Sequence, residues 1–170
     1  MKNNPSHSSL KPVVQQTTNN TTSWIGHRIG DTRNRVSGQT FTCPDEGELA
    51  AIEVFSAHVA VKGPVNLSLH AFDDRNKSWG PILQTSTIEL NRADTGKWVA
   101  FPIEGLKLRK GACYGFRLEC KDGLVGLGEA AGSYDKLPCI GGQEWWSLSE
   151  DQPGDFYSYL SLAFKVEIRA

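Results

Sequence analysis

The stretch 160-LSLAFKVEIR-169 decides the fold, because apolar and polar side chains alternate along its whole length. A period of two is typical of a β-strand that packs one face on a core and leaves the other face in solvent. The side chains on the apolar face are Leu160, Leu162, Phe164, Val166 and Ile168. We therefore expect a half-buried strand here.

The same alternation occurs earlier, where Val65, Leu67, Leu69 and Ala71 share one face of the segment 65–72. Further strands are expected at 39–43, 82–90, 98–103, 113–120 and 124–127. Gly, Pro, Asn and Asp separate these segments at short intervals, which is typical of turns. Many short strands with frequent turns predict an all-β fold, an antiparallel β-sandwich or barrel.

One segment is ambiguous, because residues 46–61 fit both a helical stripe and a strand. Its centre, Ile52-Glu53-Val54-Phe55, is β-branched and aromatic, and this favours the strand.

The chain of 170 residues, with 39% hydrophobic and 22% charged residues, is long enough for one substantial core. Residues 1–22 are rich in Asn, Ser, Thr and Gln and hold few apolar side chains that could offset the entropy of ordering. We expect a flexible polar tail over residues 1–22 and a single β-sandwich domain over residues 23–170.

The charges are balanced, since 18 Lys and Arg face 19 Asp and Glu for a formal net charge of −1. Such a chain has no overall field to attract nucleic acid, and no stretch approaches the roughly 20 apolar residues of a membrane span. Neither nucleic acid nor membrane insertion is expected. No signal-peptide core is present either, so the chain as given is expected to be cytoplasmic, and extracellular if a leader was removed.

The four cysteines are Cys43, Cys113, Cys120 and Cys139. Cys113 and Cys120 lie on one expected strand, roughly 23 Å apart at about 3.3 Å per residue and on opposite faces, so they cannot pair with each other there. No Cys-x-x-Cys motif or Cys/His cluster indicates zinc. Buried free thiols are expected.

The order of the segments resembles that of a known group of modules. The segments are Gly38 to Thr42, Leu49 to Phe55, Val65 to Phe72, Trp98 to Phe101, Leu108-Arg109-Lys110-Gly111 with Tyr114-Gly115-Phe116, and a last strand after Asp155. The chain is similar over about residues 36–170 to bacterial jelly-roll modules of the carbohydrate-binding and galactose-binding-like kind. The resemblance implies a jelly-roll-like β-sandwich and a non-catalytic binding module for carbohydrate.

No known catalytic motif is present: there is no Gly-x-Ser-x-Gly elbow, His-Glu-x-x-His, phosphate-binding loop or EF-hand loop. The chain is therefore not expected to be an enzyme. A glycosidase pair could be selected from Glu129, Asp135, Glu144 and Asp155, but solvated loop charges are the stronger interpretation.

One cofactor is a candidate. Asp73, Asp74 and Asn76 crowd one loop, and their oxygens are of the kind that binds calcium, although these residues are also ordinary turn formers.

Aromatic residues in polar loops give the main indication of function. Trp79 follows a polar run, and Trp145 and Trp146 follow a glycine pair, so that one of these two neighbours would enter the core and the other meet solvent. An exposed Trp face stacks on a sugar ring while nearby polar groups bond the hydroxyls. The candidate ligand-binding residues are Trp79, Tyr134, Asp135, Gln143, Glu144, Trp145 and Trp146.

Trp24 and Trp98, which are embedded in apolar patterns, are expected in the core. The alternative for the loop tryptophans is that they only close the ends of the sandwich. In that case the chain would be a structural or protein-protein interaction domain within a larger assembly. A glycan and a protein therefore both remain candidate partners.

Overall fold

The computed structural model describes residues 9–149 and 151–169 of the chain. Strands dominate it, with one short 3-10 turn, η1 (Arg92–Asp94). The strands are β1 (Leu10–Gln16), β2 (Thr21–His27), β3 (Asn34–Thr42), β4 (Gly47–Val61), β5 (Gly63–Asp73), β6 (Ser78–Leu90), β7 (Lys97–Pro102), β8 (Lys107–Leu108), β9 (Cys113–Glu119), β10 (Leu124–Ala131), β11 (Glu144–Ser147), β12 (Asp155–Tyr157), β13 (Leu160–Leu162) and β14 (Phe164–Arg169).

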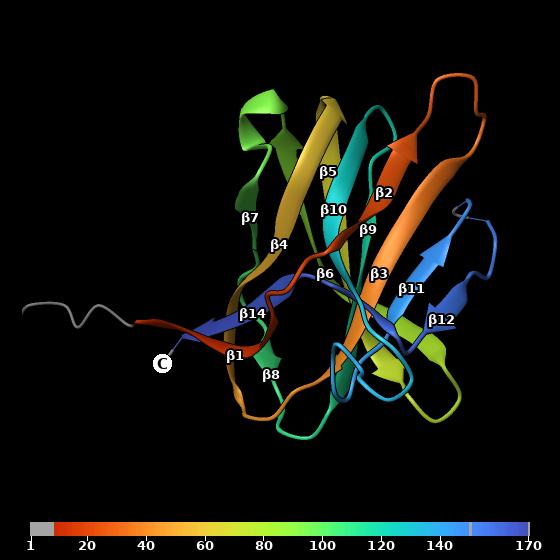
Figure 1. Cartoon of the computed structure of the whole chain (residues 1–170). Coiled ribbons are helices and arrows are strands. Elements are labelled where there is room, and N and C mark those ends of the chain that lie inside the picture. The colour runs from red at the N-terminus through yellow and green to blue at the C-terminus, as the bar shows by residue number, and fades with distance from the viewer. Residues whose placement is uncertain (1–8, 150, 170) are drawn as a thin grey trace, which may run out of the picture.

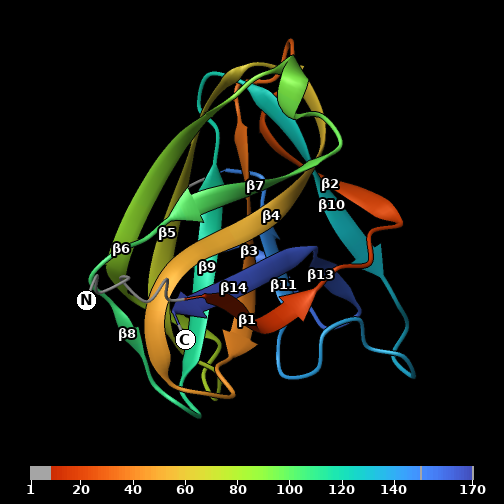
Figure 2. The ribbon, with the colours of Figure 1, turned by 90° about the vertical axis from the view of Figure 1, so that its left-hand side faces the viewer.

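The strands form one 14-stranded antiparallel sheet in the order β1-β14-β4-β10-β2-β3-β9-β5-β6, to which the remaining strands attach. The sheet curls on itself, so that β7, β4 and β14 lie across β5, β9 and β3 (Figures 1 and 2). The predicted all-β antiparallel β-sandwich is confirmed. At one end, β11 pairs with β3 and β12 pairs with β11, and this extension carries most of the features discussed below.

The core lies between the two curled layers. Phe164 is fully buried and contacts Phe41 and Phe116 at ring-centroid distances of 6.1 and 5.7 Å. Burying one such side chain contributes about 1.5–3 kcal/mol relative to exposure. Leu162, Phe164 and Val166 are each 0% exposed and Ile168 is 4% exposed, as the alternation predicted. The segment is nevertheless divided into β13 and β14, and Ser161 and Ala163, expected on the solvent face, are also 0% exposed, so the predicted facing is wrong at these two positions.

The ambiguous segment is a strand, β4, which pairs with β14 and β10 and also with β7 and β8. A helix there would have left the adjacent backbone groups of four strands without partners, whereas an extended β-branched segment pairs with all of them.

The expectation of a flexible tail over residues 1–22 is wrong for most of its described part. Residues 10–16 form β1, which pairs with β14 along its length, and β2 begins at Thr21. Val13 and Val14 pack against the core, and the side-chain amide of Gln16 donates to the carbonyl of Leu162 over 3.2 Å. Backbone pairing with an edge strand therefore orders a segment whose composition is polar. Residues 1–8 lie outside the described residues.

Trp24 and Trp98, expected in the core, are only partly buried and lie on the outer face of the sheet. Their neighbours Ile25 and Val99 take the core positions instead, because successive side chains on a strand alternate. Trp24 contacts the ring of His58, and Trp98 contacts Phe55 and the ammonium of Lys165.

The four cysteines are free thiols, as expected, and three of them are buried while Cys113 is partly exposed. Within the described ranges, no helix has the length and apolar character needed to cross a bilayer.

Candidate functional site

The site lies where the sheet extends beyond the core, on strands β3, β11 and β12. Strand β11 pairs with β3 on one side, with Trp146 opposite Ser37, and with β12 on the other, with Glu144 opposite Tyr157. Residues opposite each other in a pair share a face of the sheet. Glu144, Trp146 and Tyr157 therefore lie on the same face as Ser37, which is the face that continues into the core.

Four aromatic rings follow one another along this region, and we call Trp146, Tyr157, Tyr159 and Tyr134 the aromatic series. Trp146 and Tyr157 stack with a centroid distance of 5.4 Å and an interplanar angle of 12°. Tyr157 contacts Tyr159 at 6.0 Å, and Tyr159 contacts Tyr134 at 5.6 Å. The first three rings are half-buried, and the last ring, that of Tyr134, is 80% exposed.

The two faces of the Trp146 ring are already occupied. The guanidinium of Arg35 lies over the ring at 4.7 Å from its centroid, and Tyr157 stacks on it in parallel. Arg35 comes from β3 and Tyr157 from β12, the strands on either side of β11. Trp146 thus supports the series from within, and the ring surface available to a ligand is that of the tyrosines.

The turn that carries Tyr134 is tight. The backbone N–H of Ser133 donates to the carbonyl of Lys136 over 3.0 Å, and the N–H of Lys136 donates back over 3.1 Å. Tyr134 and Asp135 are the two central residues of this turn, and both are exposed. Asp135 therefore stands beside the outermost ring, where its carboxylate meets solvent.

A hollow of about 430 Å³ adjoins Trp146 at the end of β11. This volume is within the range of small-ligand sites, about 300–1,000 Å³. Its lining mixes charged, hydroxyl and apolar groups: Arg33, Trp146, Ser147, Leu148, Ser149, Gln152, Pro153, Gly154 and Asp155. The aromatic series and the hollow together form one continuous region around Trp146.

Two carboxyl groups meet beneath the aromatic series. Glu144 is 0% exposed and Glu129, on β10, is 9% exposed. Within the described residues no N–H or O–H group donates to Glu144, whereas the hydroxyl of Thr21 donates to Glu129 over 2.7 Å. Burial, with a hydrogen bond and repulsion from Glu129, raises the pKa of Glu144 to about 11. Glu144 is therefore protonated at neutral pH and shares its proton with Glu129, since two ionised carboxylates could not form that bond.

The interpretation of the four acids as solvated loop charges is thus wrong for Glu129 and Glu144, which lie on strands and are buried. The pair also differs from the carboxylates of a glycosidase, which must touch the substrate. Glu144 has no exposed surface with which to do so.

Trp145 and Trp79 lie on the opposite face of the sheet from the aromatic series. Trp145 is 1% exposed, and its indole N–H donates to the carbonyl of Pro153 over 3.1 Å. Its ring contacts that of Trp79 at 5.5 Å, and the guanidinium of Arg117 lies 4.4 and 4.3 Å from the centroids of these two rings.

Trp79 is part of β6 rather than of a polar loop, and its ring also contacts Phe72 and His70. Gly115 provides the space, since a Cβ there would come within 2.6 Å of the indole. Trp79 and Trp145 therefore lie apart from the aromatic series, and their rings mainly pack against other side chains.

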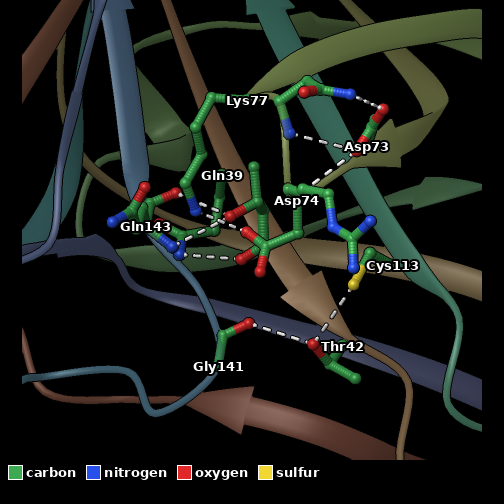
Figure 3. A network of polar contacts seen from close by, with 11 residues as sticks. Gln39, Thr42, Asp73, Asp74, Lys77, Cys113, Gly141 and Gln143 are labelled. Atoms are coloured by element: carbon green, nitrogen blue, oxygen red, sulfur yellow. Dashed lines mark hydrogen bonds and ion pairs between the residues drawn. The ribbon is translucent and has the colours of Figure 1, made fainter.

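Gln143 connects the site loop to the sheet through its backbone. Its N–H donates to the Thr40 hydroxyl over 2.9 Å, and its carbonyl accepts from the Thr40 N–H over 2.9 Å. Thr42 donates to the carbonyl of Gly141 over 3.3 Å, so both ends of this stretch are anchored to β3 (Figure 3).

Of the predicted calcium ligands, Asp73 is the last residue of β5, and Asp74 and Asn76 lie in the turn that leads to β6. Figure 3 shows Asp73 and Asp74. The carboxylate of Asp73 accepts hydrogen bonds from the backbone of Arg75 and from the backbone and side chain of Asn76, while Asp74 pairs with Lys77. Over the part of the chain that the structure describes, no three His, Cys, Asp or Glu side chains form a metal-binding group. Calcium binding at this turn stays a prediction.

The sequence interpretation did not select Tyr157, Tyr159, Arg35 or Glu129 as site residues. Tyr157 and Tyr159 could have been found, because two tyrosines separated by one residue lie on one side of an extended chain. Arg35 and Glu129 reach the site only through the pairing of β3 with β11 and of β10 with β2 and β13.

The sequence matches no family model and no curated protein. The fold is similar to that of a variant of the clostridial cysteine protease Cwp84 after propeptide cleavage, with a TM-score of 0.57 and 12% identity over 98% of this chain and 41% of that chain. A structure of the cysteine protease and lectin-like domains of Cwp84, a surface layer associated protein of Clostridium difficile, gives a TM-score of 0.49 and 12% identity over 80% of this chain and 32% of that chain.

This chain spans less than half the length of either structure. At such identity the similarity concerns the fold alone.

Proposed function

We propose that the chain is a non-catalytic module that binds carbohydrate on the aromatic series. The observation that carries the proposal is the run of contacts from Trp146 through Tyr157 and Tyr159 to Tyr134, which ends in a ring that is 80% exposed. The chemistry of this surface supports the proposal.

The surface offers both kinds of contact that a saccharide needs. Tyrosine rings present flat apolar faces to the C–H groups of a sugar ring, and their hydroxyls remain available for hydrogen bonds. Asp135 on one side and the hollow with Gln152 and Asp155 on the other supply further polar groups. Since each of the four rings already contacts a neighbouring ring of the series, little side-chain entropy is lost when a ligand binds.

Titration calorimetry with a panel of neutral and acidic oligosaccharides tests the proposal. Replacing Tyr134 or Tyr159 by Ala is expected to weaken binding at least tenfold, because each substitution removes an accessible ring face. Ile140→Ala is the matched control, since Ile140 is 94% exposed in the same loop as Tyr134 but carries no aromatic ring. Equal losses in all three variants, or saturable binding that none of them changes, would refute the proposed surface.

One observation favours a protein partner as the second candidate. The loop between β10 and β11 exposes Tyr134, Leu137 and Ile140 at 80%, 44% and 94%, which is a high apolar content for one loop. If this loop binds protein, Leu137→Ala and Ile140→Ala would weaken the association as strongly as Tyr134→Ala. A saccharide stacked on the tyrosines would instead be insensitive to Leu137 and Ile140.

A further inference from the structure

We propose that the saccharide bound by this module carries a carboxylate, and that Arg35 binds that carboxylate beside Trp146. This inference rests on the proposed function and adds the chemical class of the ligand and the residue that selects it.

The guanidinium of Arg35 is held in place but has no ion-pair partner among the described residues. Its Nε–H is buried and donates to no acceptor there, although buried polar groups are nearly always hydrogen-bonded. The stack on Trp146 fixes the plane of the group at 4.7 Å from the ring centroid. A guanidinium with a fixed plane presents its N–H groups in the fork that matches a carboxylate.

Two buried carboxyls, Glu129 and Glu144, lie near Arg35 and raise its pKa by attraction, but neither forms an ion pair with it within the described residues. Glu144 is protonated, because burial and Glu129 raise its pKa to about 11. Glu129 accepts the hydroxyl of Thr21 and the proton of Glu144, and no ion pair joins Glu129 to Arg35 across the described part of the chain.

Other charged side chains of both signs lie at this end of the sheet. Arg28 lies close enough to act on Arg35: after burial, repulsion from Arg28 is the largest influence that lowers the pKa of Arg35. Arg33 lines the hollow and pairs with Asp31 at 3.2 Å. Asp155 lines the same hollow, and Tyr157 stands on the far side of Trp146. An anionic group of the ligand would reduce the repulsion between Arg28 and Arg35.

Arg117 provides a matched control within the same chain. It also lies over indole rings and has a buried Nε–H without a partner, but it is on the opposite face of the sheet. Arg117 stacks on the rings of Trp79 and Trp145, as Arg35 stacks on that of Trp146. The two arginines therefore pack alike, but only Arg35 lies on the face that carries the aromatic series.

The test compares tetragalacturonic acid with the neutral tetrasaccharide obtained by reducing its carboxyl groups, by calorimetry at low and at high salt. We expect the acid to bind at least tenfold more tightly than the neutral sugar, and the difference to shrink as salt increases. Arg35→Gln is expected to abolish the preference, so that the acid binds no more tightly than the neutral sugar, and Arg35→Lys is expected to retain part of the preference. Arg117→Gln is expected to keep the preference.

The outcomes separate this inference from the proposed function. Equal binding of both saccharides, with both lost in Tyr134→Ala, would overturn the inference and leave the proposed function in place. A preference for the acid that survives Arg35→Gln would overturn the assignment of Arg35. A poly-glutamate peptide that binds as tightly as the acid would show that the ligand class is wrong, and no binding of any saccharide would overturn both proposals. Melting temperatures of all variants establish that they are folded.

Discussion

Replacing Glu144 by Gln is expected to remove a large part of the pH dependence of folding stability. In the folded state the pKa of Glu144 is raised from 4.5 to about 11, with burial as the largest cause and Glu129 as the next. At a pH between 4.5 and about 11, Glu144 is protonated in the folded chain and ionised in the unfolded chain. The free energy of unfolding therefore falls as the pH rises, by about 1.4 kcal/mol for each pH unit.

Raising the pH from 5 to 8 would thus lower the wild-type free energy of unfolding by about 4 kcal/mol through Glu144. A change of this size in a domain of this length corresponds to about 10 °C in melting temperature. The Gln side chain has nearly the same shape, donates to Glu129 through its amide and does not titrate. The variant should therefore equal the wild type within about 1 kcal/mol at pH 5 and exceed it at pH 8.

Urea denaturation at pH 5, 6, 7 and 8, followed by tryptophan fluorescence, measures the difference between the two proteins. The comparison cancels the contributions of other groups, such as Glu167, whose pKa is raised to about 6, and His70, whose pKa is lowered by burial. Parallel curves for the wild type and Glu144→Gln would refute the shared-proton account of this pair.

Three further predictions concern the fold and the calcium site. Leu162→Ala or Phe164→Ala is expected to cost about 2–5 kcal/mol in chemical denaturation because it opens a core cavity, while Lys165→Ala costs under about 1 kcal/mol; similar losses at all three would contradict the assigned facing. Deleting residues 1–16 removes β1 from the edge of β14 and is expected to lower the melting temperature by several degrees, whereas an unchanged value would show that this pairing adds no stability. The predicted calcium site requires that calcium raise the melting temperature of the wild type and not of Asp74→Ala, and identical curves with calcium and with a chelator would exclude it.

The fold could be predicted from the sequence where alternation is strong. In residues 160–169 the apolar face is visible directly, and in residues 46–61 β-branched residues decide between two patterns. Strand β1 could not be predicted, because its order comes from backbone pairing with β14 rather than from its own composition. Trp24 and Trp98 were misplaced because both faces of their strands contain apolar residues, so hydrophobicity did not identify the inner face.

Part of the candidate site could also be predicted. Tyr134, Glu144 and Trp146 were selected from the sequence, and the structure places them at one end of the sheet. Alternation correctly separated Trp145 from Trp146, with the first buried and the second half-exposed. Trp79 was misassigned because a polar run precedes it, and only the pairing of β6 with β5 shows that it is in a strand.

The central claim, that a saccharide binds on the aromatic series, is tested most directly by NMR. The five tryptophans give separate indole N–H signals, and they divide among three surfaces: Trp146 next to the tyrosines, Trp79 and Trp145 on the opposite face, and Trp24 and Trp98 on the outer face of the other layer. Titrating the labelled protein with the tightest-binding oligosaccharide is expected to shift the indole signal of Trp146 and the amides around Tyr134 and Tyr159. The signals of Trp79 and Trp24 should remain in place. Shifts confined to Trp79 or to Trp24 and Trp98, with Trp146 unchanged, would contradict the account.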